Sequence, residues 1–121
     1  MDARLREGIR LFNERRFFES HEILEPFYQE TEDENKPFLE GLIQLAAAFR
    51  MYTEFGETQG PVRMIHQALI RFENYRPSFL QIQVERLSRA AEAWAEAAQN
   101  KAADLAANIP KIQTQRFNFF S

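Results

Sequence analysis

The chain contains no cysteine among its 121 residues. This absence excludes disulfide bonds, thiolate nucleophiles and metal sites built from cysteine. The sequence also lacks the roughly 18 uninterrupted apolar residues that a membrane span requires, and its first residues carry no apolar run of the signal-peptide kind. We therefore expect a cytoplasmic protein without a membrane partner.

Blocks of charge of one sign are missing as well. The formal net charge is −3, from 15 basic and 18 acidic side chains that are mixed along the sequence. Nucleic-acid binding usually requires a basic patch or stripe, so we expect no nucleic-acid partner. The acidic residues at positions 30–34 lack the glycine and the alternating ligands of a calcium loop, which favours a solvated loop there.

Apolar residues are abundant and recur at helical spacing. Hydrophobic residues make up 45% of the chain, 12 of them phenylalanine, and no segment shows the sustained alternation of a strand. The sequence predicts an all-α fold, a compact array of about five helices around a central apolar helix at about residues 37–55. We expect one domain over residues 1–108. An aromatic tail at 109–121 would then dock on the domain or lie at an oligomer contact.

Individual residues mark where helices begin and end. Asp2 is a suitable N-cap for the first helix, and Gly56 is suited to ending the central one. Pro26 falls inside the second helix, where it removes one backbone hydrogen bond, so we expect a kink or an early end there. Gly41 and the three alanines at positions 46–48 indicate that another helix crosses the central one closely.

The segment over residues 17–28 holds the main candidate site. If it is helical, His21 and Glu25 are neighbours one turn apart, in the middle of an apolar face. A buried charge is costly unless it is paired, hydrogen-bonded or bound to a metal. The pattern therefore predicts either a polar network or a ligand site at this position.

Two interpretations of the segment stay open. In the one we favour, His21, Glu22, Glu25 and Gln44 form a structural polar core or a binding surface that serves association with an unknown protein partner or self-association. In the alternative, the protein is a metal-dependent hydrolase. His21 and Glu25 would then bind a divalent metal ion, and Glu22 would act as the catalytic general base that activates a bound water. A catalytic zinc usually has three protein ligands, so this site needs another carboxylate, from Glu22 or Glu40.

Four segments together resemble a known family. They are residues 8–13, residues 17–25 with the His-Glu pattern, residues 41–48 with the sequence Gly-Leu-Ile-Gln-Leu-Ala-Ala-Ala, and a glycine at position 60 that leads into a helix. Over about residues 5–95, the chain resembles the small bacterial, archaeal and plastid proteins called domain of unknown function 309.

The resemblance implies a compact all-helical domain and no defined activity. A label of predicted metal-dependent hydrolase, sometimes given to the family, would depend on His21, Glu22 and Glu25. The chain departs from the family pattern at Arg50 and Met51, where many relatives carry histidine. This departure removes potential metal ligands from this member.

Overall fold

The computed structural model describes residues 1–115, so the expectation about the aromatic residues at positions 117–120 lies outside the described part. Five α-helices account for most of the described chain, as the sequence predicts, and short 3-10 turns lie at Asp33–Asn35, Glu73–Tyr75 and Ala106–Asn108. The helices are α1 (Ala3–Asn13), α2 (Phe17–Glu30), α3 (Lys36–Phe55), α4 (Gln59–Phe72) and α5 (Val84–Gln99).

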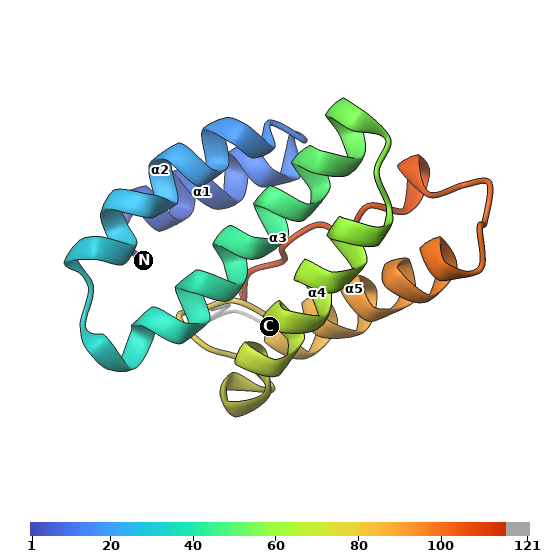
Figure 1. The fold of residues 1–121 in the computed structure, drawn as a ribbon. Coiled ribbons are helices and arrows are strands. Elements are labelled where there is room, and N and C mark those ends of the chain that lie inside the picture. The colour runs from blue at the N-terminus through green and yellow to red at the C-terminus, as the bar shows by residue number, and fades with distance from the viewer. Residues whose placement is uncertain (116–121) are drawn as a thin grey trace, which may run out of the picture.

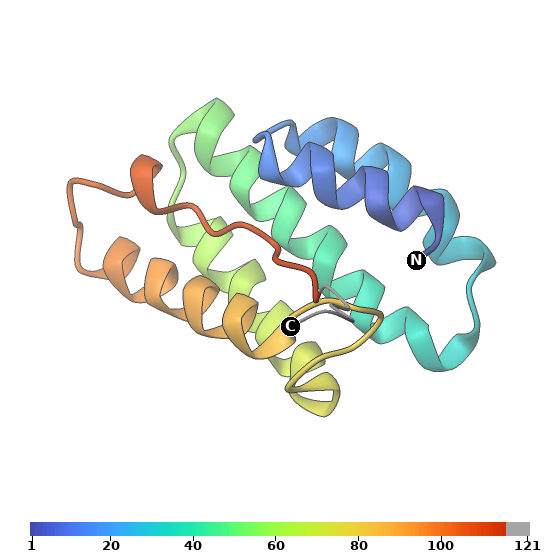
Figure 2. The ribbon, with the colours of Figure 1, turned by 180° about the vertical axis from the view of Figure 1, so that it is seen from behind.

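The helices form an open array in chain order. α1 packs on α2, α2 on α3, α3 on α4 and α4 on α5, so α3 lies at the centre (Figure 1). Seen from behind, the chain that follows α5 runs back between α5 and α1 (Figure 2). One hydrophobic core connects all five helices and this returning segment.

The helix boundaries follow the residues that marked them in the sequence, with one exception. The Asp2 side chain accepts a hydrogen bond from the Arg4 backbone N–H at 2.8 Å, and Gly56 ends α3 in a left-handed conformation with φ of 68°. Pro26 does not end its helix, because α2 continues to Glu30. Glu22, whose carbonyl loses its donor, is exposed, so water can replace the missing bond.

Close contacts join α3 to both α4 and α5. A Cβ atom built on Gly41 would lie 2.6 Å from Cε1 of Phe72, so only glycine permits the close approach of α4. Trp94 of α5 packs edge-on against Phe49, with ring centroids 5.1 Å apart. The predicted central helix and its close crossing are therefore present.

Residues 109–115 belong to this core, so the boundary placed after residue 108 cuts through it. Ile109 and Ile112 are 7% and 3% exposed. The Asn13 side chain forms two hydrogen bonds with the backbone of Ile112. Its Nδ2 donates to the Ile112 carbonyl at 2.9 Å, and its Oδ1 accepts from the Ile112 N–H at 2.7 Å. Thr114 forms an isolated antiparallel bridge with Ile82. Within residues 1–115, no helix is long and apolar enough to cross a membrane.

Candidate functional site on helix α2

His21 and Glu25 are neighbours on α2, as their spacing predicts, but they lie at the surface. His21 Nε2 is 3.3 Å from Glu25 Oε2, and the two side chains are 39% and 46% exposed. The expectation that this pair is buried is therefore wrong. A half-exposed pair is partly solvated and contributes little to stability.

Close packing between α1 and α2 explains the error. A Cβ atom on Gly8 would lie 2.5 Å from Leu24 Cδ2, so the missing side chain lets Leu24 sit directly on α1. The buried residues of α2 are Phe17, Ser20, Leu24 and Phe27. At about 100° per residue, the centre of this face lies about 80° from His21.

Ser20, rather than His21, is the polar residue inside the buried face. It is 0% exposed, and its hydroxyl donates to the Gly8 carbonyl at 2.7 Å. Sequence reasoning missed it, although a serine between Phe17 and Leu24 at steps of three and four residues was a visible signal. The hydrogen bond fixes α2 against α1 and so sets which side chains point outward.

The four residues expected to share a polar core do not come together. Glu22 is exposed on the outer side of α2. Gln44 faces α4 instead, where its Nε2 donates to Gln67 Oε1 at 3.1 Å. Glu40, the other possible carboxylate ligand, also turns to α4 and pairs with Arg71 at 3.3 Å. The prediction of one polar core is wrong, because α3 directs these two side chains away from α2.

His21 and Glu25 instead belong to a band of half-exposed side chains along α2, which we call the α2 stripe. Two cations from α3 lie over its aromatic ends: the Arg50 guanidinium is 4.4 Å from the centre of the Phe18 ring, and Lys36 Nζ is 5.8 Å from that of Tyr28. Both contacts are in the range of cation–π interactions. The α2 stripe consists of Phe18, His21, Glu25 and Tyr28.

The stripe offers two metal ligands, which is fewer than a catalytic site needs. Among residues 1–115, no group of three or more histidine, aspartate or glutamate side chains is placed to hold one ion. A catalytic zinc is usually held by three protein ligands. The residues present therefore do not fit a complete catalytic metal centre.

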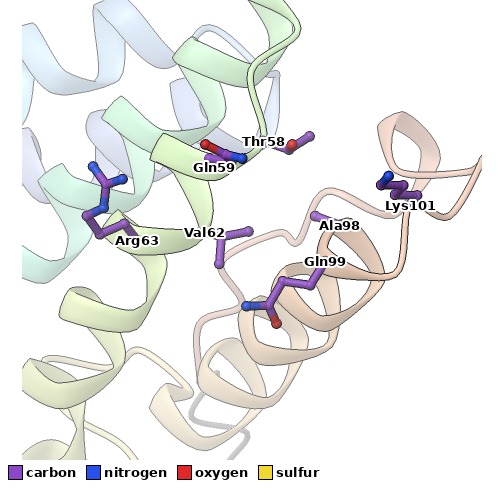
Figure 3. A pocket seen from close by; sticks show the side chains of 7 residues that line it. All are labelled: Thr58, Gln59, Val62, Arg63, Ala98, Gln99 and Lys101. Atoms are coloured by element: carbon purple, nitrogen blue, oxygen red, sulfur yellow. The ribbon is translucent and has the colours of Figure 1, made fainter.

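A cavity of about 410 Å³ lies elsewhere, between the start of α4 and the end of α5 (Figure 3). Val62 and Ala98 face each other across it, and the Arg63 guanidinium points away from Lys101. No carboxylate or imidazole lines the cavity, so it brings no acid–base pair together. Its lining consists of Thr58, Gln59, Val62, Arg63, Ala98, Gln99 and Lys101.

A cluster of arginine and glutamate side chains supports the start of α5. Hydrogen bonds from Arg76, and then from Arg89, lower the pKa of Glu85 from 4.5 to about 2. Arg76 also donates to Glu73 at 2.8 Å. All these carboxylates have arginine partners, so the cluster ties the loop after α4 to α5 and leaves no free acid or base.

These features define a small all-helical domain with a polar and aromatic stripe on one outer helix. Residues 5–64 match the model of the family described as Domain of unknown function (DUF309), and the chain belongs to this family. The match ends inside α4, whereas the sequence resemblance extended to about residue 95. No curated protein and no solved structure matches the chain.

Proposed function

We propose that the protein is a non-catalytic binding domain whose interaction surface is the α2 stripe, and that it acts in the cytoplasm. The observation that carries the proposal is that Phe18, a large apolar side chain that is 45% exposed, lies on α2 only three residues before His21. Phe55 and Ile70 are more exposed, but they lie on α3 and α4, away from the His21–Glu25 pair. The partner is a protein, either another polypeptide or a second copy of this chain.

The chemistry of the stripe suits protein association. Aromatic residues and arginine are enriched at interfaces and supply most of the residues that dominate binding energy. Phe18 and Tyr28 each have one cation from α3 over one face of the ring, which limits their freedom before binding. Side chains that are already ordered lose less conformational entropy when a partner arrives.

The polar centre of the stripe adds specificity. His21 and Glu25 are close enough to pair, yet about 40% or more of each side chain remains accessible. Their outer polar atoms can therefore form hydrogen bonds with a partner, which fix its orientation between the two aromatic ends. Glu25 also accepts a bond from Gln29 at 3.4 Å.

Paired surface variants test this function. Phe18→Ser and Tyr28→Ser should each abolish a complex, while circular dichroism shows an unchanged helical content. Ile70→Ser is the matched control, because Ile70 is 74% exposed on α4, outside the stripe. Quantitative affinity capture should show proteins that are retained by wild type and by Ile70→Ser but lost with both stripe variants. Sedimentation velocity of the purified proteins reports self-association. Identical capture and sedimentation for all four proteins would contradict the proposal.

The second candidate is a metal-dependent hydrolase, and the 3.3 Å separation of His21 Nε2 and Glu25 Oε2 is the observation in its favour. The missing third ligand weighs against it. Elemental mass spectrometry of protein purified without chelators decides between the two candidates, with Glu25→Gln as the comparison. Near-stoichiometric metal that disappears in Glu25→Gln would favour the hydrolase. Metal-free, folded wild type would favour the binding domain.

A further inference from the structure

A second cavity, of about 210 Å³, lies where the start of α1, the end of α2 and the loop before α5 meet. Its floor is apolar and buried, because Leu5 is 1% and Phe27 is 8% exposed. Four of its six lining side chains are apolar, and the cavity is open to solvent. We call it the terminal pocket; it is lined by Met1, Asp2, Leu5, Phe27, Leu80 and Gln81.

The described chain ends at the edge of this pocket. The Gln115 N–H donates to the carbonyl of Gln81, a lining residue, at 2.7 Å. The next residues are Arg116 and Phe117. Two residues of extended chain span up to about 7 Å, so the Phe117 side chain can reach the pocket without rearrangement of the helices.

We propose that the terminal pocket is the docking site of the chain's own C-terminal segment, with Phe117 as the side chain that fills it. An aromatic ring removes the apolar floor from water, which is favourable in proportion to the area covered. We assign the pocket to Phe117 rather than to Phe119 or Phe120, which follow it in the sequence. The inference is independent of the α2 stripe, which is made of other residues.

A double-mutant cycle in the full-length chain tests the contact. Phe117→Ser should lower the equilibrium constant for folding about tenfold, as expected for exposing a partly buried aromatic side chain. The same change at Phe120 is the matched control and should alter it less than about twofold. Leu80→Ala removes one wall of the pocket. In that background Phe117→Ser should have a clearly smaller effect, because the effects of substitutions at contacting residues are not additive. Urea unfolding measures the equilibrium constant for folding of each variant.

Several results would overturn the proposal. Equal effects of the Phe117 and Phe120 substitutions, or full additivity with Leu80→Ala, would show that Phe117 does not occupy the pocket. If Leu80→Ala does not fold, Phe27→Leu, which changes the floor of the pocket, replaces it in the cycle, and the same criterion applies. A Phe117 effect that appears only at concentrations where sedimentation detects a dimer would assign the pocket to the tail of a second copy instead.

Discussion

Removing the Asn13 side chain should loosen the segment that closes the helix array. Asn13→Ala eliminates two hydrogen bonds to the backbone of Ile112, a residue that is only 3% exposed. A hydrogen bond contributes about 0.5–1.5 kcal/mol net, and an unsatisfied buried group costs about 1–3 kcal/mol. Because two main-chain groups lose their partner while Asn13 itself is half-buried, we expect a loss of about 3 kcal/mol in the free energy of unfolding.

Urea unfolding followed by circular dichroism measures this loss, and thermal unfolding should show a fall of about 10 °C in Tm. Asn108→Ala is the matched control. Its amide bonds only to Asp104, four residues away in an exposed turn, and we expect less than about 0.5 kcal/mol there. If Asn13→Ala and Asn108→Ala cost the same within about 0.5 kcal/mol, the apolar contacts and main-chain hydrogen bonds of residues 109–115 hold the segment without help from the Asn13 side chain, which would contradict the prediction.

Three further predictions concern the core and the electrostatic cluster. Gly41→Val should lower the free energy of unfolding by about 2 kcal/mol in a urea titration, because a Cβ atom there lies 2.6 Å from Phe72; an unchanged midpoint would contradict the close crossing. Trp94→Phe should cost about 2–3 kcal/mol, since it leaves the Leu105 carbonyl without its indole donor at 2.9 Å, and a loss below about 0.5 kcal/mol would refute this. Because the pKa of Glu85 is lowered from 4.5 to about 2 in the folded protein, its stabilising effect should be present above pH 4.5 and disappear as the pH falls toward 2. The gap in urea midpoint between wild type and Glu85→Gln should close over that range, and a gap that does not change with pH would contradict it.

The helices could be predicted because their signals are local. Asp2 and Gly56 act within one turn of the helix ends that they mark. Gly41, together with the alanines at positions 46–48, correctly indicated a helix crossing. Such features depend on neighbours in sequence, so a single sequence contains them.

The outward face of α2 could not be predicted from periodicity alone. The sequence of α2 allows two choices of buried face, one centred near His21 and the other near Leu24. The choice depends on Gly8, which permits the close contact with Leu24, and on the bond that Ser20 makes to the Gly8 carbonyl. These contacts join two helices, and the only sign of them within α2 is the position of Ser20 between Phe17 and Leu24.

The role of residues 109–115 escaped prediction for a similar reason. The segment is short and contains Pro110, so it shows neither a helical nor a clear strand period. Its position depends on Asn13, which is 99 residues away from Ile112 in sequence. An asparagine near a helix end ordinarily indicates a cap or a turn, and here it binds a distant main chain instead.

Site-specific photo-crosslinking in cells tests the central claim, that the α2 stripe binds a protein, most directly. A photoreactive phenylalanine analogue replaces Phe18 in one protein and Ile70, on α4, in the other. We expect a discrete crosslinked protein product with the analogue at position 18, a weaker yield of that product when His21→Ala is added, and no product with the analogue at position 70. No product at position 18, or the same products at both positions, would contradict the assignment of the stripe as the interaction surface.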